Sequence, residues 1–178
     1  MIARVGQDLR AAQTCWGIDL IEATGIRRFL EPLEFAEPLH TSRAIAQAHG
    51  YPDIIAPYSS LLAFGMPALW QAGAIAFSSA ERNAQPPLAA NIATLPHVSR
   101  KYSGLFATDM DFEFLRPARV GERLGRRGSK LLSCVPKETS VGRGAFIKYE
   151  SEIITESGEV IARQIVGIYV YEPKAATA

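Results

Sequence analysis

The feature that most constrains the fold of this chain is a change in sequence period near residue 102. From residue 106 to residue 114, apolar and acidic side chains alternate, and residues 147–153 continue the pattern. Residues 160–171 are almost continuously apolar and β-branched, as in a central strand. A period of two predicts an antiparallel sheet, because every second side chain lies on the same face. On the first strand, the predicted apolar face carries Phe106, Thr108, Met110, Phe112 and Phe114.

The first half of the chain has a helical period instead. Apolar residues within 26–30 fall on one side of a helix. Ser42 is a candidate N-cap for a short helix over residues 43–49, which Gly50 would end. Residues 58–73 are apolar on nearly every side and predict a long buried helix. This order of elements predicts an α+β fold, and a sheet curled around the buried helix is one of several possible arrangements.

Length and charge limit the organisation and the partners of the chain. Its 178 residues fit one domain spanning 1–178, with no repeat or linker to divide it. Residues 174–178 are expected to form a disordered tail. A net charge of +1 provides no basic field for nucleic acid or an anionic membrane surface. The apolar stretch 54–77 is interrupted by prolines and polar residues, so it does not predict a membrane span.

The sequence also gives expectations for compartment and cofactors. No targeting segment is visible at the N-terminus, and we expect a cytoplasmic protein. Cys15 and Cys134 have no spacing typical of a metal site or a disulfide framework, so they predict reduced thiols. No metal or other cofactor is implied.

Three segments, in order along the chain, carry a family resemblance. Residues 26–29 read Ile-Arg-Arg-Phe and lead into Pro-Leu-His at 38–40. Residues 46–57 contain Ala-x-x-x-Gly-Tyr-x-x-Ile-x-Ala-Pro, and residues 114–124 contain an Arg-Pro turn followed by Gly-Glu. Together they resemble the MaoC-like (R)-specific enoyl-thioester hydratases and dehydratases, most closely the MaoC dehydratase N-terminal domain branch. The resemblance implies the hot-dog fold, an antiparallel sheet wrapped around a long buried helix.

The resemblance also implies a catalytic site, with one departure from the family pattern. The family motif reads Asp-x-Asn-Pro-Leu-His, and its aspartate and histidine activate a water that adds across the double bond of an enoyl thioester. Here Phe35 stands at the aspartate position, Glu37 at the asparagine position and His40 at the histidine position. We predict that His40 is a general acid/base assisted by Glu37, with Glu34 as a weaker candidate. A hydrogen-bonded loop histidine and solvated loop carboxylates are the structural alternatives.

The start of the buried helix is the expected binding site for the thioester. In the family, backbone N–H groups at this point hold the oxygen of the enolate. The predicted substrate-binding residues are the ones that map there, together with the ring at the aspartate position: Phe35, Pro57, Tyr58, Ser59 and Ser60.

Phe35 leaves the function open because an aromatic ring cannot orient a water or accept a proton. The leading hypothesis is a hydratase or dehydratase with an altered catalytic pair. The second is a non-catalytic, acyl-thioester-binding subunit of a heteromeric dehydratase. The third is a pocket recruited to another acid/base reaction, such as a cyclisation in secondary metabolism.

The resemblance implies an acyl thioester of coenzyme A or of acyl carrier protein as the ligand. Arg116, Arg119 and Arg143 are candidates for binding phosphate, because guanidinium groups match phosphate geometry. Scattered arginines are more commonly surface charges. Half-apolar strands at the sheet edge predict a dimer, either a homodimer or a heterodimer with another hot-dog subunit.

Overall fold

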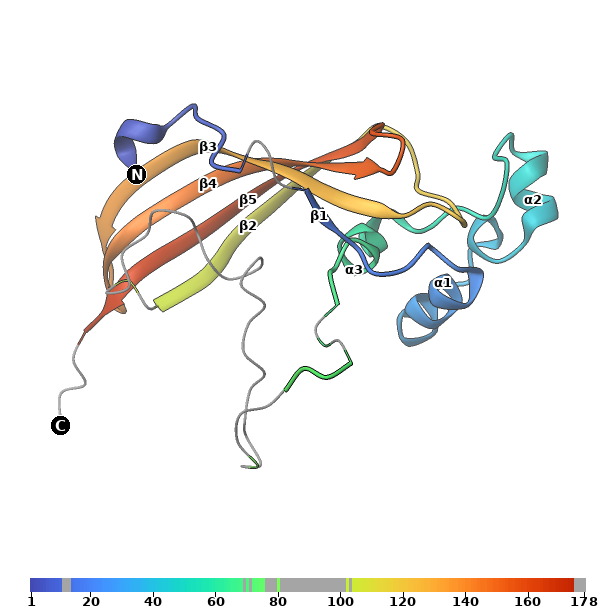
Figure 1. Ribbon diagram of the computed structural model, residues 1–178, viewed down its shortest axis with the longest axis horizontal. Helices are drawn as coiled ribbons and strands as arrows, with labels where there is room; N and C mark the ends of the chain where they lie inside the picture. Colours follow the sequence, from blue (N-terminus) through green and yellow to red (C-terminus); the bar gives the residue numbers. More distant parts are fainter. Residues whose placement is uncertain are drawn as a thin grey trace.

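The computed structural model describes residues 1–10, 14–68, 70, 72–75, 80, 102 and 104–174. It has one five-stranded antiparallel sheet, in the order β1-β3-β4-β5-β2, with the three α-helices gathered near one end (Figure 1). The strands are β1 (Thr14–Trp16), β2 (Gly104–Phe114), β3 (Leu124–Glu138), β4 (Gly142–Thr155) and β5 (Val160–Pro173). The helices are α1 (Ala23–Leu30), α2 (Arg43–Ala48) and α3 (Leu61–Phe64), with 3-10 turns η1 (Ile2–Arg4), η2 (Glu31–Leu33), η3 (Pro38–His40) and η4 (Tyr58–Ser60).

The strands predicted from alternation are confirmed as β2, β4 and β5. One predicted detail is wrong, because Phe106 does not share a face with Met110 and Phe112. The pairing of β2 with β5 shifts between Ala107 and Asp109, and this β-bulge places one extra residue in β2. Since the side-chain period is two, one extra residue moves Phe106 to the opposite face. Its ring lies there against Tyr169, with 5.5 Å between the ring centroids.

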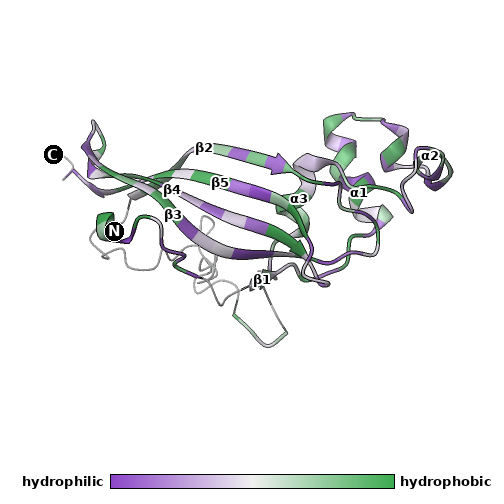
Figure 2. Cartoon of the chain, turned by 90° about the horizontal axis from the view of Figure 1, so that it is seen from above, coloured by the Kyte–Doolittle hydropathy of each residue, from purple (hydrophilic) through white to green (hydrophobic). Residues whose placement is uncertain are grey.

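The two faces of the sheet differ in polarity. The face called here the inner face carries a buried apolar cluster: Leu131, Ile147, Val166, Ile168 and Val170. The opposite face, called the outer face, carries cross-strand ion pairs: Arg163–Glu113 at 2.7 Å, Arg127–Glu152 at 2.7 Å and Lys148–Asp109 at 2.6 Å. Figure 2 shows hydrophilic and hydrophobic segments alternating along these strands.

A second buried cluster joins the helices to one end of the sheet. Its members come from α1, α3, the loops beside them, the loop between β2 and β3 and the ends of the strands: Ile21, Ile26, Leu30, Ile54, Ala56, Leu61, Ala118, Leu124, Ile153, Ile161 and Ala162. The predicted apolar side of the first helix is therefore confirmed, since α1 buries Ile26 and Leu30. The cluster fixes the helical segments against the sheet.

The helix predicted over residues 58–73 is much shorter than expected. It begins as η4 at Tyr58, continues as α3 and ends at Phe64. Gly65 follows the helix, and Pro67 disfavours a helical conformation at the residue before it. Among the described residues after Gly65, Met66 and Trp70 are more than half exposed, so this part is not the buried helix that was predicted.

The short helix α2 follows its prediction closely. The Ser42 hydroxyl accepts a hydrogen bond from the backbone N–H of Ile45 at 3.4 Å, as an N-cap does. Gly50 follows the helix with φ of 86°, in the left-handed region that favours glycine.

The end of the chain differs from its prediction at one residue. Lys174, expected in the disordered tail, donates its backbone N–H to Val141 at 3.2 Å. Residues 175–178 lie outside the described residues. No helix in the described part of the chain is long and apolar enough to cross a membrane.

Candidate functional site

The predicted catalytic histidine is fixed by a backbone carbonyl. His40 ends η3, and its Nδ1 lies 2.8 Å from the carbonyl oxygen of Ile55. A carbonyl oxygen only accepts hydrogen bonds, so Nδ1 carries the proton. In the neutral ring, Nε2 is then the unprotonated nitrogen. The described residues place no hydrogen-bond partner at Nε2, which leaves this atom able to accept a proton.

The segment that holds His40 is itself anchored on two sides. The Ile55 N–H donates to the carbonyl of Leu39 at 3.3 Å, which joins it to the histidine turn. On the other side, Ala56 N–H donates to Ala118 at 2.7 Å and Val120 N–H donates to Ile54 at 3.0 Å. These bonds place the 38–40 turn, the 54–56 segment and the 118–120 loop side by side.

His40 opens into a hollow of about 210 Å³ between α1 and its own turn. The hollow is lined by Ala23, Thr24, Arg27, His40, Thr41 and Ile54. Arg27 forms an ion pair with Glu31 one helical turn away. The sequence predicted no role for Thr24 or Arg27. Arg27 lies in the Ile-Arg-Arg-Phe motif, which was a signal for it, whereas Thr24 precedes the motif and carried no signal.

Phe35 contacts the histidine directly. Its ring centroid lies 5.8 Å from that of His40, with the two planes tilted by 40°. The side chain is 52% exposed, so it does not bury the imidazole. Glu34, just before it, has a φ of 51°, and this left-handed turn directs the chain toward the histidine. The aspartate position of the family motif is thus beside the histidine, but it offers a ring instead of a carboxylate.

Glu37 lies close in sequence but shows no side-chain bond to the histidine. It is the N-cap residue of η3, and its backbone carbonyl accepts the N–H of His40 at 3.1 Å. Within the described residues, no hydrogen bond joins its carboxylate to the imidazole, and Glu34 and Glu37 are both exposed. The assisting role of Glu37 therefore stays a prediction.

The four residues predicted at the helix start have different environments. Ser60 is fully buried, and both its hydroxyl and its backbone N–H donate to the Pro57 carbonyl, at 2.6 and 2.9 Å. Its hydroxyl is therefore committed to closing η4. Tyr58 and Ser59 are exposed, and their N–H groups belong to the first turn, which has no acceptor within the helix. The Tyr58 ring packs on Phe114, with 4.3 Å between centroids.

The three arginines predicted to bind phosphate do not form one site. All five N–H groups of Arg116 are engaged, by Glu159, Glu122 and the Pro117 carbonyl. These bonds raise the pKa of Arg116 above its already high ordinary value, chiefly through Glu159. No donor remains for a phosphate, so the structure argues against this role for Arg116.

Arg119 and Arg143 are also separated from each other. Arg119 forms an ion pair with Glu122 at 3.0 Å and is 41% exposed at its side chain. Arg143 lies at the start of β4, whereas the other arginines lie near its far end, where Thr155 pairs with Leu124. Twelve residues of strand span roughly 40 Å. Arg119 and Arg143 therefore stay predictions as two separate candidates for phosphate contact.

The described residues contain no group of three histidine, cysteine, aspartate or glutamate side chains that could hold a metal ion. Cys15 and Cys134 form no disulfide, and burial raises the pKa of the Cys134 thiol above its ordinary value.

Comparisons with known proteins point to one family. A family model described as "FAS1-like, dehydratase domain region" matches residues 14–164. The "Probable enoyl-CoA hydratase alpha subunit" of Thermomonospora curvata is 26% identical over 158 residues, covering 89% of this chain and 47% of that protein. The chain therefore spans about half the length of this relative.

Solved structures share the fold. The ChsH1-ChsH2 complex from Mycobacterium tuberculosis superposes with a TM-score of 0.66 at 21% identity, covering 93% of this chain and 86% of the matched one. The MaoC-like dehydratase from Rhodospirillum rubrum gives a TM-score of 0.59 at 19% identity, covering 94% and 96%. These neighbours confirm the predicted α+β hot-dog fold.

Proposed function

The chain belongs to the family of FAS1-like dehydratase domain regions, and from this membership we propose that it adds water to enoyl thioesters or removes it from 3-hydroxyacyl thioesters. The observation that carries the proposal is the tether from His40 Nδ1 to the Ile55 carbonyl. It fixes the ring and leaves Nε2 as a base, as proton transfer requires.

In this proposal the two parts of the site divide the reaction between them. During hydration, His40 Nε2 takes a proton from water as the oxygen bonds to the β-carbon. The electrons of the double bond move to the thioester oxygen, and the resulting enolate is held by the N–H groups of Tyr58 and Ser59. The protonated imidazole then returns a proton to the α-carbon. Dehydration is the same sequence in reverse.

Phe35 means that any carboxylate partner of His40 must come from elsewhere. Glu37 is the proposed assistant, because it stands three residues before the histidine and caps the same turn. Glu34 is a matched comparison, since it is an exposed glutamate of the same loop. We propose that His40 acts with Glu37, and that Glu34 contributes no more than local charge.

Hydration of crotonyl-CoA and longer enoyl-CoA esters by the purified chain tests this proposal. Loss of the conjugated thioester absorbance reports the rate. His40→Ala should reduce kcat/KM by at least about a hundredfold, in the range for removal of a general base. Glu37→Gln should reduce it less, and Glu34→Gln should leave it near the wild-type value. An unchanged rate in His40→Ala would overturn the assignment of the base.

A second function has specific support, namely an acyl-binding subunit that completes another chain's active site. The aspartate position is occupied by Phe35, and β2 pairs on one side only with β5 among the described strands. Its side chains Leu105, Phe106 and Met110 are 42% to 53% exposed. The likeness to one chain of a two-protein complex is consistent with such an arrangement.

Co-expression with a hot-dog chain that has the intact Asp/His motif separates the two functions. If this chain is the binding subunit, the complex is active and His40→Ala in this chain leaves its rate unchanged. If this chain is catalytic, the same substitution lowers the rate of the complex. Either arrangement makes β2 the proposed dimer edge, with a homodimer as the alternative assembly.

The carrier and the location of the protein stay proposals. We propose coenzyme A or acyl carrier protein as the carrier, with Arg119 and Arg143 as separate candidates for phosphate contact. A cytoplasmic location remains our expectation. Binding of decenoyl-CoA and of decenoyl-pantetheine, compared by calorimetry, measures how much the nucleotide end of the carrier contributes.

A further inference from the structure

Three polar side chains interrupt the apolar inner face of the sheet. Ser151 on β4 and Gln164 on β5 are 4% and 1% exposed. Among the described residues, the Ser151 hydroxyl oxygen and the Gln164 Oε1 have no hydrogen-bond partner. Arg126 on β3 is half-buried and, among the described residues, makes no hydrogen bond or ion pair. Buried polar groups are nearly always hydrogen-bonded in native proteins, so this cluster requires an explanation.

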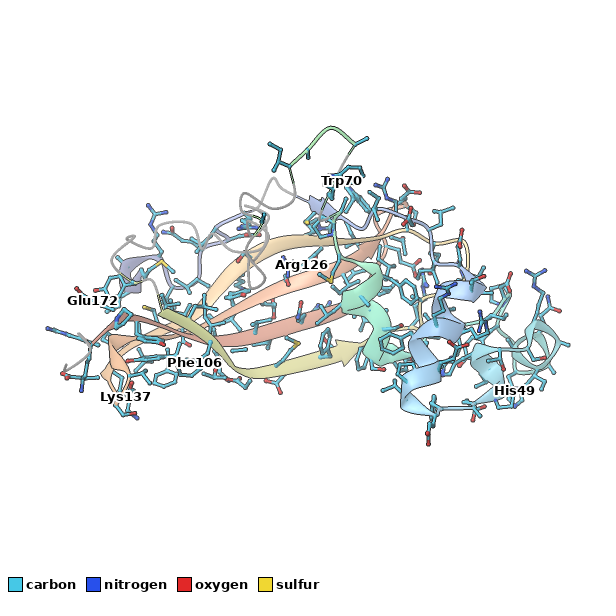
Figure 3. All side chains as sticks on the ribbon, turned by 90° about the horizontal axis from the view of Figure 1, so that it is seen from below. His49, Trp70, Phe106, Arg126, Lys137 and Glu172 are labelled. Carbon is cyan, nitrogen blue, oxygen red and sulfur yellow. The ribbon has the colours of Figure 1, made fainter. Side chains whose placement is uncertain are left out.

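The strand register brings the three side chains together. Ser151 pairs directly with Gln164, and Gln164 pairs with Phe112 on β2. Arg126 pairs with Ile153, which lies two residues from Ser151 on the same face. Diagonal neighbours of this kind are about 7–8 Å apart, within reach of a long side chain. Figure 3 shows Arg126 over the middle of the sheet, well away from His49 near α2.

Bulges beside the cluster leave Ser151 without a cross-strand partner on β3. The register of β3 shifts between Arg127 and Lys130, opposite Ser151. The N-terminal segment holds this bulge, because Asp8 accepts the N–H of Ser129 at 2.8 Å and Leu9 donates to its carbonyl at 2.9 Å. Such irregularities are typical of positions where a sheet accommodates a functional group.

A row of aromatic rings links the cluster to the proposed thioester site. The Tyr58 ring, at the start of η4, packs on Phe114, and Phe114 stacks on Phe112 with 5.3 Å between centroids. Phe112 is the direct neighbour of Gln164. Two residues of strand are about 7 Å, so the cluster lies roughly 12 Å from the ring of Tyr58. An acyl chain that starts at η4 and follows this row would reach Gln164.

Within the described part of the chain, Met110 contributes the one hydrogen bond that the amide of Gln164 makes. Its sulfur accepts from Nε2 at 3.3 Å, which is a weak hydrogen bond. Met110 lies on the edge strand and is 45% exposed, and its flexible thioether can change position without breaking the core. Gln164 on β5 is therefore next to Met110, a side chain on the neighbouring strand β2 that is able to move.

From this arrangement we propose that Arg126, Ser151 and Gln164 bind a hydroxyl group on the distal part of the acyl chain. A hydroxyl has one donor and two lone pairs. It can donate to Gln164 Oε1 while accepting from the Ser151 hydroxyl and from the Arg126 guanidinium. A plain hydrocarbon satisfies none of these groups. This proposal for a hydroxyl-binding site depends on the proposed function in one respect, namely that the ligand is an acyl thioester.

Equilibrium binding tests the proposal without requiring turnover. The probes are decenoyl-CoA and decenoyl-CoA esters that bear one hydroxyl on a carbon of the distal half. Calorimetry with the full chain should find one hydroxylated ester that binds about tenfold more tightly than decenoyl-CoA. Ser151→Ala and Gln164→Met should each remove most of that preference. Ser133→Ala, on the outer face opposite Lys148, should retain it.

The experiments can refute the hydroxyl-binding site and the hydration reaction separately. A chain that hydrates decenoyl-CoA but binds all esters equally would refute the hydroxyl site alone. A chain that binds with the predicted preference but does not hydrate would refute the proposed reaction alone. Failure to bind any of the esters would overturn the site as well.

Thermal unfolding provides a second readout on the ligand-free chain. Ser151→Ala and Gln164→Leu remove buried polar atoms that have no partner among the described residues, so each should raise the melting temperature by about 2 °C or more. Ser133→Ala should leave it unchanged. A lower melting temperature for both inner-face variants would mean that the ligand-free protein already satisfies these groups, and the proposal would be wrong.

Discussion

Replacing Arg116 by alanine should destabilise the protein through the carboxylate that the arginine leaves behind. Arg116 and Glu122 are 23% and 13% exposed at their side chains, and two hydrogen bonds of 2.9 and 3.0 Å join them. Glu159 completes the group from the turn between β4 and β5 and is 51% exposed. The substitution therefore removes two hydrogen bonds from the largely buried Glu122, which keeps the guanidinium and the backbone N–H of Arg119 as partners, and it leaves Glu159 as a well-solvated charge.

The size of the effect follows from that difference in exposure. Breaking a fully buried ion pair by removing one partner costs about 3–5 kcal/mol, whereas a fully exposed pair contributes about 0–1 kcal/mol. Arg116 and Glu122 retain some contact with water, and Glu122 keeps its ion pair with Arg119, so we expect the free energy of unfolding to fall by about 1–2 kcal/mol. Most of that loss belongs to Glu122, since water solvates Glu159 after the change.

Urea denaturation followed by circular dichroism measures this loss, with Arg163→Ala as the matched control. Arg163 also pairs with a glutamate across strands, but its side chain is 43% exposed and Glu113 is 60% exposed. The control should lose much less stability. Equal losses in the two variants would refute the argument from burial. Amide exchange should also accelerate at Ala56 and Val120, whose bonds join the 118–120 loop to the His40 tether.

Three further predictions concern other parts of the molecule. Tyr169→Phe should cost about 1–3 kcal/mol in chemical denaturation, because the one proton of the fully buried hydroxyl is shared between two backbone carbonyls at 2.8 and 2.9 Å, whereas Tyr171→Phe should cost little. Hydrogen bonds from arginines hold the pKa of Glu159 and of Asp53 below their ordinary values of 4.5 and 3.8. Because both carboxylates have a lower pKa in the folded protein, they contribute stability above pH 4.5. This contribution should be lost as the pH falls through the folded pKa values, and urea midpoints measured at a series of pH values test this. Phe35→Asp should raise the rate of enoyl-CoA hydration, because it returns a carboxylate beside the histidine ring, and Phe35→Asn is the uncharged control.

Alternation predicted the sheet because long strands with one apolar face follow it closely. β2, β4 and β5 lie where the pattern placed them, and Ser42 caps α2 as its residue type suggested. The face of Phe106 was not predictable, since one extra residue at a bulge reverses all side chains beyond it. β1 and β3 were not predicted, and β3 contains two register shifts that break its alternation.

The candidate site was predictable where a motif fixes the backbone and not where it depends on tertiary contacts. Pro38 and the two residues after it form the expected turn, and His40 meets the segment that leads into η4. The partners of Arg116 could not be predicted, because Glu159 is distant in sequence and approaches only through the sheet. Gln164 did carry a signal, as a lone amide in an almost continuous apolar run.

The hydration rate of the wild-type chain and of His40→Ala, measured on one enoyl-CoA with and without a partner chain that has the intact Asp/His motif, tests the central claim most directly. We predict that the substitution lowers kcat/KM by at least about a hundredfold in both settings, because Nε2 of the tethered ring is the base. Equal rates for the complexes that contain the wild-type chain and the His40→Ala chain, together with no hydration by either form of the chain alone, would contradict catalysis by His40 and make this chain the binding subunit.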